Sequence, residues 1–504
     1  NRWFRQLSSS GNCLKNCAIV WGFLLIPHDI RHSVTYVKGI IAQTTGYSAL
    51  DYMTSVYNNF SSFFVPGVVA PLVTPQGIRL PISNYDPEAT LENKQSNFTQ
   101  EVRVQSADAG APLKWVIGTY YQNNKGRNTE FLTDPNASDL TLALFGLTAD
   151  QFLGLPLING GETYRGTYHT RDKQIALFGQ LDYSLTEKLK VTVGARVSKN
   201  KFSFTNSADG PINGGPTQAI GQQKETPFTP KVGVSYQLDA GNMVYASYAK
   251  GYRIGGANAP IPFSPCASGF GQLGINGAPT DYNSDTTNSY ELGSKNRLFG
   301  GKVQLATSAY YIKWKNIQQA TTVPICGYVY IDNQGEAVSQ GFDLQMQARP
   351  VDGVQLDVAF GYTDAHYSST LVQGPRTVVR DGNSLGGPEW TLSLGGQYDF
   401  EAFAKPVFIR ADWQHAGLQK GLTPAQDPLV PASYDGTIPV PPATDYVTLR
   451  TGITFDQLQL ALFVDNVLNS SEILTRSHRT RTSPFYGNTS WRPRTYSLIA
   501  TYRF

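Results

Sequence analysis

Residues 495–504 read TYSLIATYRF. In an extended strand the even-numbered residues from Tyr496 to Phe504 share one apolar face, and the opposite face is polar except for Ile499. An apolar-out, polar-in strand that ends on an aromatic residue is typical of the closing strand of an outer-membrane β-barrel. An amphipathic strand of a soluble sandwich alternates in the same way. The rest of the chain must therefore decide between the two.

The composition favours the barrel. Charged residues make up 16% of the 504 positions, below the roughly 25% of soluble domains. Aromatic residues reach 12%, yet the mean hydropathy is slightly polar at -0.27. A sheet that presents every second side chain to lipid has this balance. The net charge of +3 is too small to indicate nucleic-acid binding.

Alternating segments recur along the chain, and we count ~16 of them, each near the ~10 residues that cross a bilayer at a tilt. Their connections alternate between short turns and long loops rich in Gly, Pro and Asn. The short turns are 108–112, 186–188, 239–242, 298–301, 350–353, 401–406 and 456–457. The long loops are 54–95, 126–171, 207–225, 254–285, 317–334, 368–387, 416–443 and 467–493. This alternation predicts an antiparallel transmembrane barrel with short periplasmic turns and long external loops.

The N-terminal segment does not fit this pattern. No run reaches the ~18 apolar residues of a membrane helix, and the longest, 18–26, is half that length. It could be a signal-peptide core, a buried strand or sequence foreign to the fold. We therefore leave residues 1–35 unassigned and predict one barrel domain over 36–504, located in the bacterial outer membrane.

Several motifs, taken in order, resemble the barrel of TonB-dependent outer-membrane receptors, in the iron-complex branch seen in sphingomonad-like bacteria. They are 97–106 (NFTQEVRVQS), 115–121 (WVIGTYY), 244–253 (VYASYAKGYR), 289–295 (SYELGSK), 341–344 (GFDL), 464–469 (VDNVLN) and 492–504. The resemblance covers about residues 36–504. It implies TonB-energised uptake of a scarce nutrient complex, foremost a ferric siderophore.

The chain departs from that family in two respects. Members carry an N-terminal plug domain and a TonB box, and neither is found here. They also have 22 strands, against the ~16 counted. We expect an N-terminally truncated fragment whose parent contacts the TonB complex through the missing region. A passive porin for small solutes is the alternative, because 16–18 strands enclose an open channel.

No catalytic, metal or cofactor motif is present, so an enzyme is not expected. Asp281, Asn283 and Asp285 resemble the beginning of a calcium loop, but the glycine and glutamate that such a loop needs are missing. The partners implied are membrane lipid, the TonB complex and a small-molecule iron chelate, with no nucleic acid and a monomeric barrel. Candidate ligand contacts lie at external strand ends, where arginine can hold an anion and aromatic rings can stack. They are Tyr252, Arg253, Asn258, Trp314 and Arg494.

The four cysteines are too few for a disulfide scaffold. Cys266 and Cys326 fall in the long loops 254–285 and 317–334, which lie on the same external side and are separated by one hairpin. The cell surface is oxidising. We therefore predict a disulfide between Cys266 and Cys326, with two free thiols as the alternative. Cys13 and Cys17 lie in the unassigned segment and are given no pairing.

Overall fold

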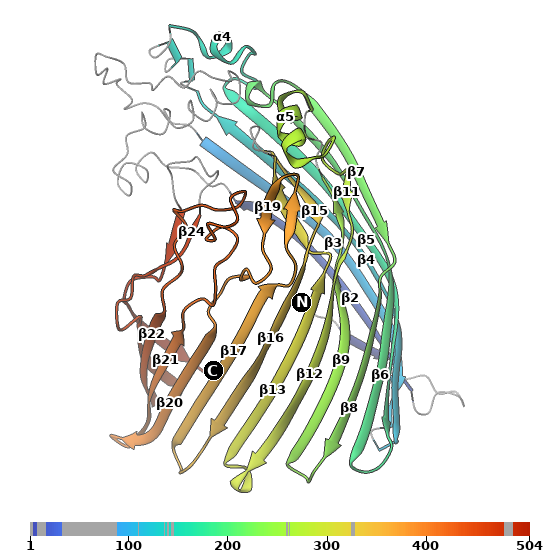
Figure 1. The fold of residues 1–504 in the computed structure, drawn as a ribbon. Coiled ribbons are helices and arrows are strands. Elements are labelled where there is room, and N and C mark those ends of the chain that lie inside the picture. Colours follow the sequence, from blue (N-terminus) through green and yellow to red (C-terminus); the bar gives the residue numbers. More distant parts are fainter. Residues whose placement is uncertain are drawn as a thin grey trace.

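Strands that curve around a common axis dominate the computed structural model (Figure 1). The structure describes residues 4–7, 17–32, 88–108, 110–135, 137–138, 141–142, 146–258, 261, 263–323, 328–477 and 487–503. Eighteen strands form one sheet. In chain order they are β1 (Phe4–Leu7), β2 (Cys17–His32), β3 (Glu88–Ser106), β4 (Leu113–Thr133), β5 (Glu162–Ser184), β6 (Leu189–Asp209), β7 (Thr217–Glu225), β8 (Phe228–Gln237), β9 (Asn242–Arg253), β12 (Asp285–Leu298), β13 (Val303–Lys315), β16 (Glu336–Ala348), β17 (Val354–Tyr367), β20 (Trp390–Ala402), β21 (Lys405–Ala416), β22 (Thr444–Phe455), β23 (Leu458–Asp465) and β26 (Thr495–Tyr502).

The loops between the long strands contain smaller helices and strands. Four two-stranded sheets are β10 (Gly256–Ala257) with β11 (Asp281–Tyr282), β14 (Gln318–Thr322) with β15 (Val329–Asn333), β18 (Leu371–Gln373) with β19 (Arg376–Val379), and β24 (Ile473–Ser477) with β25 (Gly487–Ser490). Helices α4 (Ala149–Leu153) and α5 (Phe263–Leu273) lie at the loop end of the sheet, and η2 (Pro211–Asn213) and η3 (Phe299–Gly301) are single 3₁₀ turns. No helix in the described part of the chain is both long and apolar enough to cross a bilayer.

Neighbouring strands of the large sheet pair antiparallel in chain order, as predicted, except that β7 does not pair with β8. β6 pairs with both β7 and β8, through Asn200 opposite Glu225 and Val197 opposite Phe228. Pro227 lies between β7 and β8 and has no N–H to donate to the ladder. It interrupts a single membrane crossing, which therefore consists of two strands. With β7 and β8 taken as one crossing and β1 left out, the 18 strands make 16 crossings within the described residues.

All seven expected short turns join neighbouring strands at one end of the sheet, and the described parts of the long loops lie at the other (Figure 1). Phe403 and Ala404 alone connect β20 to β21, and both have a φ of 56°. Two successive residues with positive φ match the right-handed twist of the flanking strands. Short turns and long loops therefore alternate between the two ends of the sheet, as the sequence predicted.

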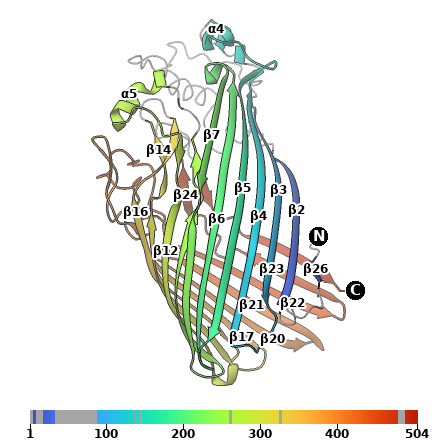
Figure 2. The ribbon, with the colours of Figure 1, turned by 90° about the vertical axis from the view of Figure 1, so that its right-hand side faces the viewer.

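Four strands are longer than predicted. β3, β4, β5 and β6 contain 19, 21, 23 and 21 residues, and β4 to β6 rise above the rest of the sheet (Figure 2). β3 begins within the expected loop 54–95, and β4 to β6 continue into the expected loops 126–171 and 207–225, of which only 134–161 and 210–216 separate the strands. The prediction was wrong here because it took every strand to have the length that crosses a bilayer, whereas these strands have polar extensions.

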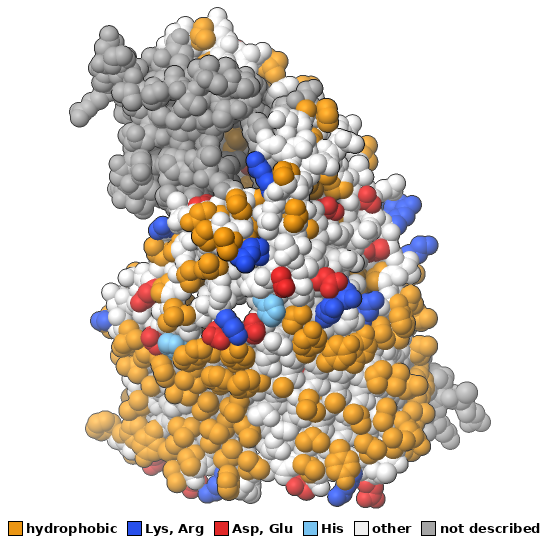
Figure 3. All heavy atoms as spheres, viewed as in Figure 1, with side chains coloured by type: hydrophobic (Ala, Val, Ile, Leu, Met, Phe, Trp, Pro, Cys, Tyr) orange, Lys and Arg blue, Asp and Glu red, His pale blue; other side chains and the backbone are white. Residues whose placement is uncertain are grey.

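An apolar belt crosses the lower half of the face shown in Figure 3. Its outward side chains include Leu292, which is 63% exposed, and Ile175, which is 57% exposed. On the last strand Leu498 is 74% exposed. Leu462, which a soluble core would bury, is 45% exposed. An antiparallel sheet with its large apolar side chains outward is the arrangement that lipid requires.

Strand β2 lies ahead of the predicted start of the barrel at residue 36 and pairs with β3 from Cys17 opposite Ser106 to His32 opposite Leu91. Residues 36–53, with which the predicted barrel domain begins, fall outside the described residues. Within those residues no ladder joins β26 to β1, β2 or β3. The domain boundary at residue 36 and the missing plug stay predictions.

Candidate ligand-binding site at the external loops and lumen wall

Arg253 is the centre of a cluster at the external ends of β9, β12 and β13. The sheet register sets it opposite Asp285, the first residue of β12. Its Nε donates to Asp285 Oδ2 at 3.1 Å, and its guanidinium forms an ion pair with the same carboxylate. The guanidinium carbon lies 5.5 Å from the ring centroid of Trp314. Two of the predicted ligand residues, Arg253 and Trp314, are therefore in contact.

The carboxylate in this cluster was not anticipated. The Asp285 side chain is 3% exposed, and its oxygens also accept from the Gln318 backbone N–H at 3.3 Å. The Gln318 side chain in turn donates to the Ile254 carbonyl at 2.9 Å. A buried carboxylate needs such partners, so Arg253 is largely neutralised. An anionic ligand would meet a paired guanidinium rather than a free one.

Asn258 fastens one external loop to another. Its Nδ2 donates to the carbonyls of Pro279 at 2.9 Å and Ile331 at 2.7 Å, and its Oδ1 accepts from the Ile331 N–H at 2.8 Å. Both ends of the amide are thus used between loop 254–285 and strand β15. Its contact with a ligand stays a prediction.

Cys266 lies within a small hydrophobic core formed by the same two loops. It is fully buried and disulfide-bonded, and it packs in a cluster with Phe270, Val323 and Tyr330. Tyr328 also packs against this cluster, and the Val323 N–H donates to the Tyr328 carbonyl at 2.7 Å. The predicted partner, Cys326, falls within 324–327, outside the described residues, so the pairing stays a prediction.

Tyr252 takes part in a polar network on the long strands. Its hydroxyl accepts from Gln174 Nε2 at 3.0 Å and from Asn200 Nδ2 at 3.2 Å. Arg196 donates to the Gln174 amide oxygen at 3.0 Å and lies 4.8 Å from the ring centroid of Tyr120. This network was not predicted, because its members come from four strands, β4, β5, β6 and β9, whose register the sequence does not fix.

Arg494 stands apart from the other four candidates. It directly precedes β26, is exposed, and its backbone N–H donates to Asn469 Oδ1 at 3.0 Å. Within the described residues no recorded contact joins it to Tyr252, Arg253, Asn258 or Trp314. The structure therefore brings together only part of the predicted set.

A second pair of loops is held by a buried carboxylate. Asp427, 5% exposed, accepts from Arg380 Nη1 at 3.0 Å and from Asn383 Nδ2 at 2.8 Å. Burial alone would raise the pKa of Asp427, but hydrogen bonds from Asn383 and from the Leu429 N–H, together with the Arg380 charge, hold that pKa below its usual value. This ionised group joins loop 416–443 to loop 368–387.

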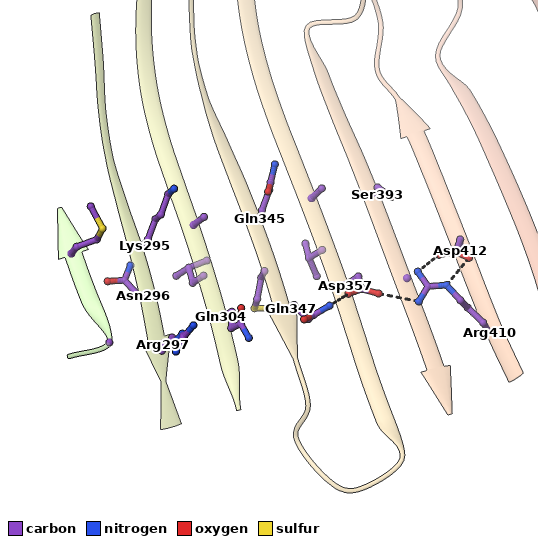
Figure 4. Close-up of a pocket in the computed structure, with 18 of the residues that line it drawn as sticks. Lys295, Asn296, Arg297, Gln304, Gln345, Gln347, Asp357, Ser393, Arg410 and Asp412 are labelled. Carbon is purple, nitrogen blue, oxygen red and sulfur yellow. Dashed lines mark hydrogen bonds and ion pairs between the residues drawn. The ribbon is translucent and has the colours of Figure 1, made fainter. Parts of the chain in front are cut away.

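The lumen wall carries a second charged group nearer the periplasmic turns (Figure 4). Arg410 on β21 donates to Asp412 Oδ1 at 2.6 Å and, across β20, to Asp357 Oδ2 on β17 at 3.0 Å. Gln347 on β16 extends the chain by donating to Asp357 Oδ1 at 3.1 Å. This group borders a hollow of about 610 Å³ that Lys295, Arg297, Gln304 and Gln345 also line. This part of the lumen wall contains cations, carboxylates and amides. It can form hydrogen bonds with a polar solute, but neither sign of charge dominates.

The two histidines near the external strand ends take no part in these sites. His366 Nδ1 lies 3.1 Å from Asp364 Oδ1, and His415 Nδ1 lies 2.9 Å from Asp445 Oδ1. The His415 ring stacks on Trp390 with centroids 4.5 Å apart. By alternation along their strands they face outward, and no group of three metal-ligating side chains occurs in the described parts of the chain.

These features define an outer-membrane β-barrel with long external loops and a polar lumen. The chain belongs to the TonB dependent receptor-like, beta-barrel family, whose sequence model matches residues 22–467. Barrels of this family are located in the outer membrane of Gram-negative bacteria, and the family is one of receptors rather than enzymes. Membership favours the receptor interpretation over the passive porin.

Two related proteins are similar in sequence to part of this chain. The metal-pseudopaline receptor CntO of Pseudomonas aeruginosa is 26% identical over 232 residues, which are 46% of this chain and 29% of that protein. The ferric-pyoverdine 358 receptor of Pseudomonas putida is 25% identical over 251 residues, or 48% of this chain and 28% of that protein. The matched stretch thus spans less than a third of either relative.

Solved structures share the fold. The ferric yersiniabactin uptake receptor FyuA from Yersinia pestis superposes with a TM-score of 0.62 at 15% identity, over 83% of this chain and 55% of that one. The siderophore receptor PiuA from Acinetobacter baumannii gives a TM-score of 0.60 at 13% identity, over 97% and 62% of the two chains. The chain therefore spans a little over half the length of these receptors.

Proposed function

We propose that this chain is the barrel portion of a receptor that binds a ferric siderophore at its external loops and imports it with energy from the TonB complex. The observation that carries the proposal is the family membership together with the relatives' ligands, since CntO is a metal-pseudopaline receptor and the Pseudomonas putida relative a ferric-pyoverdine receptor. The parent protein would contact TonB through a region ahead of the barrel and act as a monomer in outer-membrane lipid.

In this proposal the Arg253–Trp314 cluster is the principal contact with the iron chelate. The Trp314 ring would stack on an aromatic or planar part of the chelate. The paired guanidinium of Arg253, whose side chain is 53% exposed, would share its remaining donors with the ligand's oxygens. Tyr252, Asn258 and Arg494 would contribute hydrogen bonds around this centre.

Tryptophan fluorescence of the purified chain tests the proposal directly. We expect quenching on addition of ferric pyoverdine or a ferric tris-catecholate, and none with the iron-free chelators. Replacing Trp314 with Ala should weaken binding by up to about tenfold, the scale of one aromatic contact. The control is Trp115→Phe. Trp115 is the third residue of β4 and lies near the periplasmic turns, at the other end of the barrel from Trp314.

Two results would contradict the proposal. If neither ferric chelate binds saturably, ferric siderophores are excluded as the ligand class. Equal affinities for the unmodified chain and Trp314→Ala would place the site elsewhere. Growth of cells that carry the full-length parent on the bound chelate, under iron limitation, then separates uptake from binding.

A further inference from the structure

A row of lysines crosses the outer face of the long strands directly above the apolar belt. Lys173 on β5 is opposite Lys201 on β6, and Lys201 is in turn opposite Lys224 on β7. One same-face position lower on β5 is Ile175, which is 57% exposed and belongs to the belt. The strands that carry the row lie side by side (Figure 2). We call these three residues the lysine row.

A second pair of like charges lies one step higher on the same face. Lys125 on β4 is directly opposite Arg171 on β5. The acidic residues beside these cations point to the opposite face. Glu225, next to Lys224, accepts from the backbone N–H groups of Gly255 at 3.2 Å and Ser284 at 3.1 Å, on the lumen side. These five cations share the outer face with Lys199, which is opposite Ile175, and the acids next to them in sequence point to the other face.

Directly opposed like charges destabilise a sheet, because their Cβ atoms are only about 4.5–5.5 Å apart. Within the described residues none of the five cations forms an ion pair, and the Arg171 guanidinium donates only to the neutral Asn123 Oδ1 at 3.0 Å. Elsewhere on the outer face, two lysines have acidic partners. Lys313 lies 3.5 Å from Glu336, and Lys420 lies 3.3 Å from Asp364. The lysine row is thus an unneutralised strip of positive charge.

The position of the strip suggests its counter-charge. The apolar belt of such a barrel is about 25 Å tall, and a row just above it lies at the level of the lipid headgroups. Neighbouring strands are about 4.8 Å apart, so three ammonium groups span about 10 Å along the membrane surface. We propose that the lysine row, supported by Lys125 and Arg171, binds the phosphate groups of phosphorylated lipid in the outer leaflet.

Native mass spectrometry of the full chain released from nanodiscs tests this proposal. The discs contain phosphatidylcholine with a tenth of bisphosphorylated lipid A. We expect lipid A to stay bound to the unmodified barrel. The triple variant Lys173→Gln, Lys201→Gln, Lys224→Gln should bind it at least tenfold more weakly, because each basic residue at an anionic surface contributes on the order of fivefold.

Matched variants separate charge from fold. The triple lysine-to-arginine variant keeps the charge and should retain lipid A, whereas the double variant Lys313→Gln, Lys420→Gln removes paired lysines and should leave binding unchanged. The heat-dependent shift in gel mobility reports that each barrel is folded. Equal retention by the unmodified chain and the glutamine variant would overturn the proposal.

Two further arms identify the source of the phosphate. Dephosphorylated lipid A should not be retained, and millimolar inorganic pyrophosphate should not displace bound lipid A. Retention without phosphate would show that acyl chains, not the lysine row, hold the lipid. Displacement by pyrophosphate would show an anion site with no preference for lipid and would also overturn the proposal.

Discussion

The guanidinium of Arg410 lies across Gly395 on the neighbouring strand. A Cβ on Gly395 would be 2.7 Å from Arg410 Nη2 and 2.9 Å from Asp412 Oδ1, closer than side chains tolerate. Because position 395 has no side chain, Arg410 on β21 reaches over β20 to Asp357 on β17 at 3.0 Å. A glycine on the middle strand thus allows an ion pair between strands that are not neighbours.

Replacing Gly395 with Ala should break this bridge. The added methyl would displace the guanidinium from Asp357, and overpacking of this kind costs about 1–3 kcal/mol. The measurement is the urea midpoint of the barrel refolded in detergent micelles. Gly396 provides a control one residue away, since a Cβ there would meet its nearest atom, Leu356 Cδ2, at 3.7 Å. A Gly396→Ala barrel that loses as much stability as Gly395→Ala would contradict this explanation.

Sequence alone predicted the membrane-crossing part of the fold because two periodic signals are local. Alternation every second residue sets the faces of a strand, and turn residues mark where strands end. The length of β3 to β6 was missed, because above the membrane both faces of a strand can be polar. The Gly395–Arg410 contact and the Arg253–Asp285 pair were missed because they depend on the exact register between paired strands, which alternation within one strand does not fix. Five residues were predicted to contact the ligand. Of these, the structure brings Arg253 and Trp314 into contact with each other.

The two faces of β20 should respond oppositely to charge. Leu394 is 36% exposed and opposite Val358 in mid-belt, whereas Ser393 lines the lumen hollow. Leu394→Arg places a cation in hydrocarbon and should destabilise the barrel by about 2–4 kcal/mol. Ser393→Arg should cost well under half as much, because the lumen is wet. Unfolding by guanidinium in lipid vesicles measures both, and similar losses would mean that the faces are assigned incorrectly.

Arg253→Ala should loosen the external loops without unfolding the barrel. Its removal leaves Asp285, with a 3% exposed side chain, without its cation. Loss of one partner of a buried carboxylate costs about 1–3 kcal/mol. The cost here is at the low end, because the Arg253 side chain is 53% exposed and the Gln318 N–H still donates to Asp285. Limited chymotrypsin digestion within loop 254–285, which contains Phe263, Phe270 and Tyr282 but no lysine or arginine, should accelerate several-fold. The control is Lys405→Ala, whose partner Asp456 is 87% exposed, and which should leave the rate unchanged.

Acid should release loop 416–443 from loop 368–387. The pKa of Asp427 is held below its usual value near 3.8, so the folded loops favour the ionised form. The stabilisation is present above that value and is lost as the pH falls through the lower pKa of the folded state. Hydrogen exchange in residues 416–443, corrected for intrinsic rates, should rise below about pH 4. Asp427→Asn should exchange faster at neutral pH and lose the acid dependence, and an unchanged profile would exclude Asp427 as the group responsible.

The last prediction concerns the partner of the buried Cys266. Residues on both sides of 324–327 pack with it, since Val323 and Tyr328 belong to or contact the same cluster. A bond from Cys266 to Cys326 would close a loop of about 60 residues and stabilise the two external loops by about 4 kcal/mol on chain-entropy grounds. Mass spectrometry of a non-reduced digest should show one peptide pair that joins these cysteines and disappears on reduction.

The variant Cys326→Ser tests the same disulfide through thiol reactivity and proteolysis. It should free the Cys266 thiol for alkylation only after the loops are opened by denaturant, because that side chain is fully buried. It should also speed proteolysis of 254–285 to the rate seen for the reduced unmodified chain. A cross-linked peptide that joins Cys266 to Cys13 or Cys17 would show that the pairing read from the loop order is wrong.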